Sequence, residues 1–316
     1  MAKVAFVFPG QGSQYAGMGK DLYDLYPEAR QVYDTADSLL GMPITKLCFE
    51  GPEEELRLTV NTQPALFTTS IACLRLLEKQ GIRPDVTAGH SIGEYAALVA
   101  ARSMSYEQGI RLVRRRAELM QEAGKRHPGT MAAVIGLEAD DVLAACMRAD
   151  DVGIVDVANY NSPGQVVISG EVKAVEAASE YAKEAGARKI IPLNVSGAFH
   201  SRLMSYAIEK LAVELNHAHF DDAAIPVVAN VTADYVRDAD DIRDRLERQI
   251  AGSVRWEASV RRMVDDGVSI FVEVGPGKVL AGLIKRIAES VEVHSVGDAV
   301  SLEEFFIRKP GNQQRL

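Results

Sequence analysis

The chain has 316 residues, of which 47% are hydrophobic and 25% charged, and this composition excludes a disordered chain. Its formal net charge of −9 excludes a general basic surface for nucleic acid. Three cysteines without metal-type spacing favour a reducing, cytoplasmic setting over a disulfide framework. The first apolar run, residues 4–8, is too short to span a membrane, and no later run approaches that length.

The first half of the chain alternates strand and helix patterns. Residues 4–8 predict a strand, and residues 63–80 predict a long helix. A second strand is expected over residues 84–88, with another helix over residues 105–123. Alternation of this kind is typical of a parallel sheet covered by helices.

The pattern changes near residue 128. Strands are expected at 131–135, 154–158, 165–169 and 189–195, and helices at 139–149 and 171–185, with a turn through Asn161 to Gly164. The order β-α-β-β-α-β is that of the ferredoxin-like unit. We therefore predict a small ferredoxin-like subdomain at 128–196, inserted into a large α/β-hydrolase-like domain of residues 1–127 and 197–316. The mostly parallel sheet of that domain resumes with 226–229 and 270–274, and the polar tail 308–316 is expected to fray.

The run Gly89-His90-Ser91-Ile92-Gly93 has the pattern of a nucleophile elbow, a serine on the sharp turn between a strand and a helix. The glycines avoid side-chain collisions across that turn. We expect the helix to begin at the serine, where its N–H groups and dipole favour a developing oxyanion. His90 is expected to project away from the hydroxyl. The alternative is a glycine-rich corner with an idle serine.

A serine hydroxyl needs a base, and histidine is the usual one. Of the six histidines, His200 stands out because it lies where the chain leaves the small subdomain, and ligands bind between domains. The alternative is a packed or solvent-facing histidine at a helix start. His217 and His219 lie two apart, but no further ligand completes a metal site, so we expect none.

Arg116 lies on the inward, apolar stripe of its predicted helix. A buried guanidinium is costly unless it is paired, and its planar fork suits a carboxylate. Helical spacing leaves two interpretations open, a structural ion pair and a grip for an acidic substrate. Gln11 follows the first strand, where a second oxyanion donor can accompany the backbone N–H of Ile92.

Taken together, these segments resemble the malonyl-CoA:acyl carrier protein transacylases of fatty acid synthesis over nearly the whole chain. The segments that carry the resemblance are residues 8–14, 89–95, Arg116 with Met120 and Gln121, 159–165, 197–201, Arg248 with Gln249, and 273–278. In order and spacing, this set is far more specific than the elbow alone.

The resemblance implies a role for each reactive residue. Ser91 would carry the acyl group, with His200 as its base and then as the acid that releases the CoA thiolate. The main-chain carbonyl of Gln249 would orient the histidine, in place of a triad carboxylate. Backbone amides of Gln11 and Ile92 would bind the oxyanion.

The resemblance also implies the substrate pocket. Arg116 would bind the free carboxylate of malonyl, with Met120 beside it. Phe199 would narrow the space near the α-carbon and so favour malonyl over methylmalonyl. Asn159 and Asn161 would line the pantetheine channel. The implied partners are malonyl-CoA and acyl carrier protein, with no cofactor, no nucleic acid and no membrane.

Three rival functions are weighed against this one. A serine esterase or thioesterase would place a carboxylate between serine and histidine in the chain, but the aspartates there belong to the small subdomain. A free-standing acyltransferase of polyketide synthesis would differ only in its carrier. A binding module with an unreactive elbow serine is disfavoured by the joint presence of Ser91, His200, Arg116 and Gln249.

An acidic carrier would need a local basic patch on this protein. The candidates are Arg188, Lys189, Arg202, Lys278, Lys285 and Arg286.

Overall fold

The computed structural model describes residues 2–307, so the tail that is expected to fray lies outside the described residues. Its strands are β1 (Lys3–Phe8), β2 (Val86–Gly89), β3 (Thr130–Ile135), β4 (Val155–Ser162), β5 (Gln165–Gly170), β6 (Lys189–Pro192), β7 (Val227–Ala229), β8 (Asp234–Val236), β9 (Val268–Val274) and β10 (Glu292–Val296). Its α-helices are α1 (Lys20–Leu25), α2 (Pro27–Leu40), α3 (Ile44–Glu50), α4 (Glu53–Leu56), α5 (Thr59–Lys79), α6 (Gly93–Ala100), α7 (Tyr106–Arg126), α8 (Ala139–Ala149), α9 (Val172–Glu184), α10 (Ser205–His217), α11 (Ala239–Gln249), α12 (Trp256–Asp265), α13 (Val279–Ile287) and α14 (Ala299–Ile307). A short 3-10 turn, Arg202–Met204, precedes α10.

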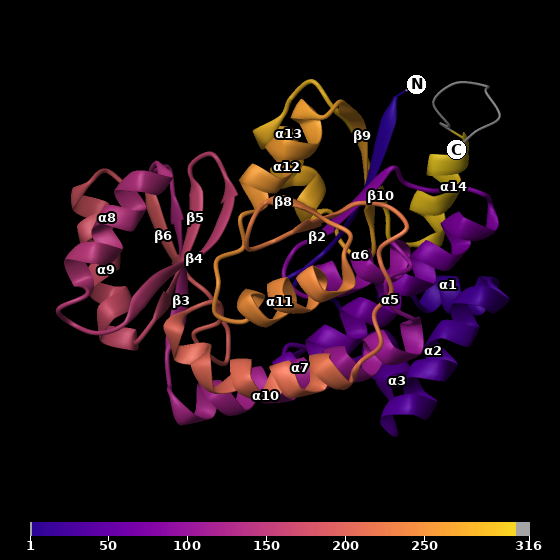
Figure 1. Cartoon of the computed structure of the whole chain (residues 1–316), viewed down its shortest axis with the longest axis horizontal. Coiled ribbons are helices and arrows are strands. Elements are labelled where there is room, and N and C mark those ends of the chain that lie inside the picture. Colours follow the sequence, from indigo (N-terminus) through magenta and orange to yellow (C-terminus); the bar gives the residue numbers. More distant parts are fainter. Residues whose placement is uncertain (1, 308–316) are drawn as a thin grey trace.

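The large sheet has six strands in the order β10-β9-β1-β2-β7-β8. Figure 1 shows this sheet to the right of the small one, which holds β3 to β6. Every neighbouring pair is parallel except β7 with β8. Residues of β1 alternate between two hydrophobic clusters, since Phe6 and Phe8 pack with α5 and α6 while Ala5 and Val7 pack with α12 and α13. The sheet is therefore covered on both faces, as parallel sheets require.

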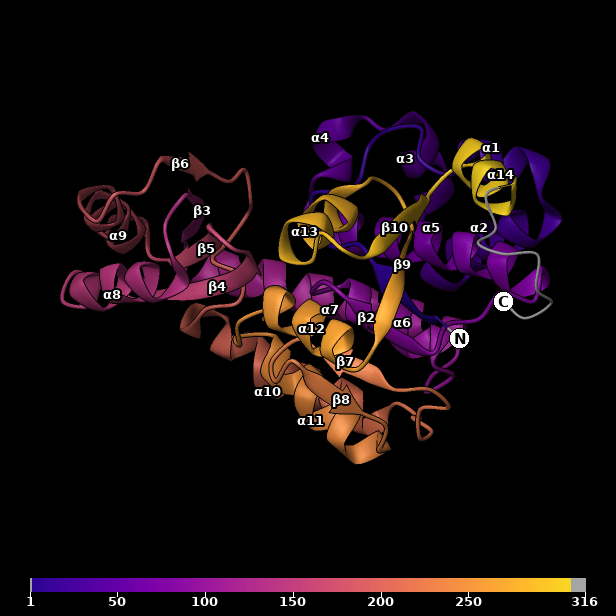
Figure 2. The same cartoon turned by 90° about the horizontal axis from the view of Figure 1, so that it is seen from above.

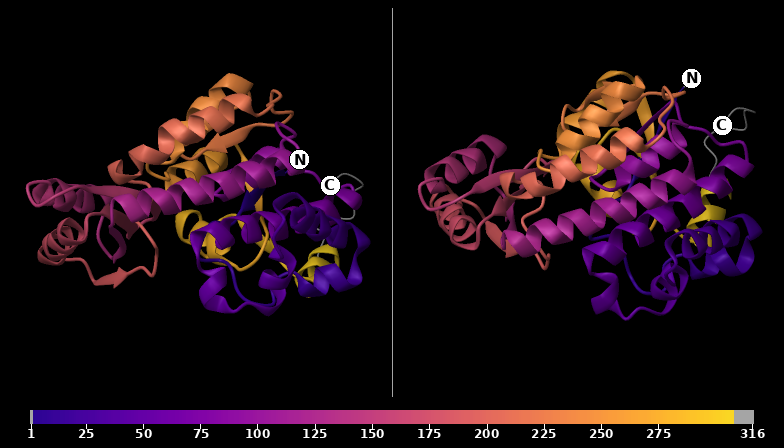
Figure 3. Two further views of the ribbon diagram at one scale, coloured as in Figure 1. Left: turned by 90° about the horizontal axis from the view of Figure 1, so that it is seen from below. Right: turned by 60° about the horizontal axis from the view of Figure 1, so that its bottom comes forward.

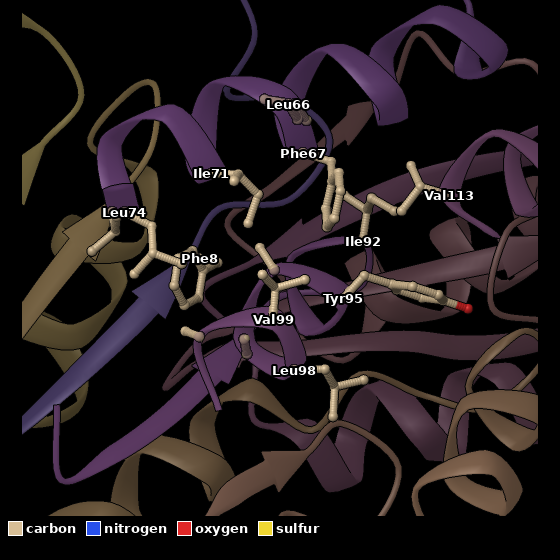
Figure 4. Packing of buried hydrophobic residues seen from close by; sticks show 14 of the residues in the cluster. Phe8, Leu66, Phe67, Ile71, Leu74, Ile92, Tyr95, Leu98, Val99 and Val113 are labelled. Carbon is tan, nitrogen blue, oxygen red and sulfur yellow. The ribbon is translucent and has the colours of Figure 1, made fainter. Parts of the chain in front are cut away.

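The core above the sheet forms around α6, the helix that follows the elbow. Figure 4 shows Phe8 of β1, Phe67 and Ile71 of α5, and Val99 of α6 with their side chains turned toward one another. All four are at most 4% exposed. Close packing on this scale makes α6 a rigid support for the residues at its N-terminus.

The small sheet has four strands in the order β4-β5-β3-β6, with every neighbouring pair antiparallel. Helices α8 and α9 cover one face, and Figure 2 shows this unit standing to one side of the large sheet. Met131 and Ala133, on the other face, belong to the main core. The predicted fold class, including the ferredoxin-like order of elements, is confirmed; the boundaries at residues 128 and 196 stay a prediction.

Two long helices and one strand connect the two sheets. Helices α7 and α10 lie side by side and run from the large sheet toward the small one (Figure 3). Strand β4 is joined to the large unit through Val254, whose backbone exchanges hydrogen bonds with Ala158 and Tyr160 at 2.8 and 2.9 Å. The small sheet is thus fixed beside the carboxyl edge of the large one, where β1 and β2 both end.

Several predicted boundaries are wrong. Strand β4 continues to Ser162, so Asn161 lies in the strand and not in the turn; two bulges hide the alternation that would have revealed it. Strand β6 ends at Pro192 and not at residue 195. Helix α5 begins at Thr59 and contains Pro64. Proline leaves the carbonyl four residues earlier without its helical donor, and the side chain of Arg114 supplies one to Val60 at 2.8 Å.

The three cysteines are free and buried. Burial raises the pKa of the Cys48 and Cys146 thiols to about 12 and that of Cys73 still further above its usual value. Each thiol therefore stays protonated in the folded chain.

Candidate active site

Ser91 lies on a strained turn between β2 and α6. Its φ of 51° lies in the left-handed region, which is rare for a residue with a side chain. A Cβ on Gly89 would collide with the backbone of Gly93, and a Cβ on Gly93 would collide with the carbonyl of Phe8. The glycines of the motif are thus required by the close approach of three backbone segments. Helix α6 begins at Gly93, two residues later than predicted.

The hydroxyl of Ser91 contacts an imidazole from a distant part of the chain. Ser91 Oγ lies 2.8 Å from His200 Nε2. His200 Nδ1 lies 2.9 Å from the carbonyl oxygen of Gln249 and 3.1 Å from that of Gly252. Because carbonyls only accept, Nδ1 carries the proton and Nε2 is left as the acceptor. The arrangement therefore places a base against the serine hydroxyl.

Burial, together with the charge of Arg116, lowers the pKa of His200 to about 3. The imidazole is consequently neutral at physiological pH and able to accept the Ser91 proton. Like Ser91, His200 has a left-handed backbone, with φ of 57°. Strain at both ends of one hydrogen bond is typical of a site held in place by its surroundings.

Arg116 projects from α7 into the same site and is fully buried, at 0% exposure. Its Nη1 donates to Gln63 Oε1 at 2.8 Å, and its Nη2 donates at 3.0 Å to both Ser91 Oγ and Gln249 Oε1. Its Nε has no hydrogen-bond partner. Within residues 2–307, no carboxylate forms an ion pair with it. The structural ion pair is therefore absent, and a buried guanidinium is held by neutral groups beside the nucleophile.

A cavity of about 100 Å³ opens over these groups. Its walls are formed by Gln11, Gln63, His90, Ser91, Ile92, Met120, Met131, Asn159, Leu193, Val195, Phe199 and His200. Of the predicted substrate-binding residues, Met120, Phe199 and Asn159 line the cavity. Arg116 and Asn161 are not among the lining residues. Arg116 reaches the cavity through its bond to Ser91 Oγ at 3.0 Å. The side-chain oxygen of Asn161 lies 2.9 Å from His90 Nε2, so His90 is turned to Asn161 and not to Ser91.

Two backbone N–H groups are free at the floor of this cavity. Within residues 2–307, the N–H groups of Gln11 and Ile92 donate to no protein acceptor. Gln11 follows the end of β1 and Ile92 follows Ser91. The N–H of Ser91 itself is occupied, because it donates to Asn230 Oδ1 at 2.7 Å. Gln11 and Ile92 are thus the backbone donors available to an oxyanion formed at Ser91.

Sequence reasoning missed three buried residues that hold the reactive groups. Gln63 bonds Arg116, and its own Nε2 lies 3.5 Å from Met120 Sδ. Asn230 bonds the elbow, and Glu94 bonds both Asn230 and Gln249. Burial raises the pKa of Glu94 to about 7. Glu94 and Gln63 lie in continuously buried runs of α6 and α5, so a polar residue within an apolar run was the signal that the sequence offered.

Other candidates lie outside the site. Arg202, from the proposed basic patch, is engaged in ion pairs with Asp150 and Asp156 at 2.9 Å. His219 is exposed and paired with Asp221. In the described part of the chain, no group of three or more His, Cys, Asp or Glu side chains could hold a metal ion. No helix among residues 2–307 is long and apolar enough to cross a membrane.

An elbow serine, a histidine held by carbonyls and two free oxyanion donors define an acyl-transferring site, and comparison with known proteins agrees. A family model described as "Acyl transferase domain" matches residues 5–303, and the chain belongs to this family. The resemblance noted from the sequence is confirmed.

Individual relatives carry a more specific name. The malonyl CoA-acyl carrier protein transacylase of Bacillus subtilis (strain 168) is 48% identical over 304 residues, which is 96% of each chain. That of Escherichia coli (strain K12) is 44% identical over 299 residues, 94% of this chain and 97% of the relative.

Solved structures agree with these relatives. An acyl carrier protein S-malonyltransferase from Vibrio cholerae superimposes with a TM-score of 0.93 at 44% identity, covering 96% of this chain and 99% of that one. A malonyl-transacylase in complex with its type II PKS acyl-carrier protein gives 0.94 at 43% identity, covering 98% and 100%.

Proposed function

We propose that this chain transfers a malonyl group from malonyl-CoA to the phosphopantetheine thiol of acyl carrier protein, through a malonyl ester of Ser91, and so supplies fatty acid elongation. The observation that carries the proposal is the position of Ser91 Oγ, 2.8 Å from the base His200 and 3.0 Å from the guanidinium of Arg116. One oxygen thus adjoins both a proton acceptor and a site for a carboxylate. The names of the relatives supply the substrate and the carrier.

In the first half-reaction, Ser91 Oγ attacks the thioester carbon of malonyl-CoA while its proton passes to His200 Nε2. The tetrahedral oxyanion lies between the N–H groups of Gln11 and Ile92, each worth about 3 kcal/mol to such an intermediate. Collapse of the intermediate breaks the C–S bond, and His200 returns the proton to the CoA sulfur. The second half-reaction runs the same steps backward, with the carrier thiol as nucleophile.

Arg116 gives the transfer its selectivity for an acid. A carboxylate that enters the cavity can accept charge-assisted hydrogen bonds from the guanidinium, whose charge no protein carboxylate neutralises directly. The bonds fix the malonyl chain at both ends, at Arg116 and at Ser91. A fixed acyl group presents its carbonyl to a thiol that arrives along the cavity opening more readily than to a disordered water.

The geometry favours transfer over hydrolysis by a serine esterase. Such enzymes hold the histidine with an Asp or Glu, whereas His200 Nδ1 faces two main-chain carbonyls, those of Gln249 and Gly252. Within residues 2–307, His200 forms no ion pair with any carboxylate. A neutral orienting group stabilises the imidazolium less, which suits a site whose substrate is an activated thioester.

Two kinds of acyl carrier protein are candidates to accept the malonyl group, because one similar structure holds a type II PKS acyl-carrier protein. A carrier from polyketide synthesis is therefore the alternative acceptor, with unchanged chemistry at Ser91. We place the protein in the cytoplasm, on the support of its three free, buried cysteines.

Intact-mass spectrometry tests the reaction directly. Mixing the protein with malonyl-CoA should add one malonyl group, which peptide mapping should place on Ser91, and Ser91→Ala should abolish the adduct. Adding fatty acid acyl carrier protein should discharge it onto the carrier. Rapid release of free malonate without a thiol acceptor would support a thioesterase, and discharge only by a polyketide carrier would support the alternative.

A further inference from the structure

Asn230 stands directly after β7, on the loop that faces the nucleophile elbow, and is 1% exposed. Its side chain bridges the elbow on both sides of His90. Its Oδ1 accepts the N–H of Ser91 at 2.7 Å, and its Nδ2 donates to the carbonyl of Gly89 at 2.6 Å. Because a backbone N–H only donates and a carbonyl only accepts, the orientation of this amide is fixed.

The backbone of Asn230 is held as firmly as its side chain. Its N–H donates to Glu94 Oε2 at 3.0 Å, and its carbonyl accepts the N–H of Arg255 at 3.0 Å. The same Glu94 oxygen accepts Gln249 Nε2 at 2.8 Å, and that nitrogen also lies 3.0 Å from the carbonyl of Ser91. Both backbone groups of Ser91 are therefore hydrogen-bonded to side chains, the N–H to Asn230 and the carbonyl to Gln249.

We propose that Asn230 is the positioning residue that holds Ser91 in its left-handed conformation and so aims Oγ between His200 and the oxyanion donors. A serine with φ of 51° relaxes toward an ordinary conformation unless its surroundings prevent it. Among the residues that the structure describes, Asn230 is the one whose side chain bonds both Gly89 and Ser91. The proposal rests on the proposed function only in naming Ser91 as the nucleophile.

A second consequence concerns the oxyanion. By accepting the Ser91 N–H, Asn230 removes it from the cavity. The backbone donors left at the cavity are thereby those of Gln11 and Ile92. Asn230 acts on the position of the nucleophile through the backbone of Ser91. Within residues 2–307, its own side chain is not among those that line the cavity and forms no hydrogen bond with Arg116.

Asn230→Ala and Asn230→Asp test the proposal, with Asn216→Asp on the exposed surface of α10 as the matched control. Acylation of Ser91 is followed with malonyl-CoA and acetyl-CoA by intact mass. A fluorophosphonate probe, which loses fluoride when an activated serine oxygen attacks phosphorus, reports the nucleophile without any acyl substrate. Failure of the probe reaction in the variants is thus separable from a wrong assignment of the substrate.

For Asn230→Ala, we expect kcat to fall about 100-fold for both thioesters, as for a nucleophile misplaced by about 1 Å. Because Arg116 and the cavity walls are untouched, KM for malonyl-CoA should stay within about twofold of the original. The probe reaction should slow by a similar factor. A folded variant that keeps kcat within about threefold, or one that loses malonyl transfer alone, would overturn the proposal.

Asn230→Asp gives a pH signature that a merely structural role lacks. A protonated carboxyl reproduces both hydrogen bonds, with C=O to Ser91 and O–H to Gly89, whereas the ionised form opposes the Gly89 carbonyl. Burial and the neighbouring Glu94 carboxyl both raise the pKa of the new carboxyl. Two positive charges lower it: Arg116, which is linked to this position through Gln249, and Arg245, which lies near Glu94.

The rate of Asn230→Asp, divided by that of the unaltered protein, should therefore fall about tenfold or more from about pH 6 to about pH 9. The division removes pH effects that both proteins share. Glu94 bonds the backbone of residue 230, so its titration is coupled to that of the new carboxyl and forms part of the signature. A flat ratio contradicts the proposal. So does failure of Asn230→Asp to fold at about pH 6, because the protonated side chain makes the same two bonds.

Discussion

The two sheets contribute to the site in different ways. The ends of β1, β2 and β7 and the helices beside them supply Gln11, Ser91, Asn230 and Arg116. The small sheet supplies walls, namely Asn159 of β4, Met131 of β3, and Leu193 after β6. Parallel strand ends hold the reacting atoms on short, buried turns, and the antiparallel sheet bounds the acyl group. Changes on the large side should therefore alter the chemistry, and changes on the small side should alter which thioester fits.

The strongest test of this division between the two sheets is at Arg116, where we expect the largest effect. Arg116→Ala removes the charged donors that meet a carboxylate, and hydrogen bonds to charged groups contribute about 1.5–3 kcal/mol each. We expect kcat/KM for malonyl-CoA to fall about 100-fold, and that for acetyl-CoA to change by less than about tenfold. The measurement is steady-state transfer of each acyl group.

The matched control is Arg115→Ala, one residue earlier. Arg115 is partly exposed and bonds Glu118 of α7 and Glu214 of the neighbouring helix α10. Both thioesters should be transferred at the original rate in this variant. Equal losses for malonyl and acetyl in Arg116→Ala would instead assign Arg116 to the support of Ser91 alone.

A smaller effect concerns the pH dependence of the large-side chemistry. Burial and the charge of Arg116 lower the pKa of His200 to about 3, so the base is neutral above that pH and is lost only as the pH falls through it. Arg116→Ala removes one of the causes that lower this pKa, so the pKa of His200 rises. The acid limb of kcat/KM for acetyl-CoA, which reports the free enzyme, should move to higher pH in Arg116→Ala. An unchanged acid limb would show that the charge of Arg116 does not lower the pKa of His200.

The smallest effect is expected on the small side. Leu193 lines the cavity from the segment after β6 and is half-buried. Leu193→Ala should raise KM for malonyl-CoA a few-fold, by about 1 kcal/mol of lost apolar contact, and leave kcat within about twofold. Ile191→Ala, on the exposed side of β6 and away from the cavity, is the control. A fall in kcat without a change in KM would make the small sheet part of the chemistry.

The sequence predicted the two sheets because alternation and strand order are local patterns. It also placed Ser91, since the glycine spacing and the strand and helix patterns on either side lie within one short segment, and it placed Arg116 on an inward face from helical spacing alone. The arrangement of His200 with Gln249 followed from resemblance, because the two residues are joined only through a main-chain carbonyl.

The remaining features depend on contacts between distant segments. Asn230 looks like any polar residue after a short strand, and its two bonds to the elbow span 139 and 141 residues. The extent of β4 was hidden by its bulges. The start of α5 was hidden by Pro64, whose cost is offset by an arginine from α7. None of these three features can be recognised from a short stretch of sequence.

The burial of Cys48, Cys73 and Cys146 has a consequence for an enzyme that shuttles acyl groups between sulfurs. A thiolate on the protein surface would itself intercept activated esters and become a dead-end acceptor, since the thiolate is the nucleophilic form. With all three side chains shielded and protonated, none of these sulfurs competes with Ser91 for the acyl group. Alkylating reagents that modify accessible sulfhydryls should accordingly leave the folded catalyst untouched.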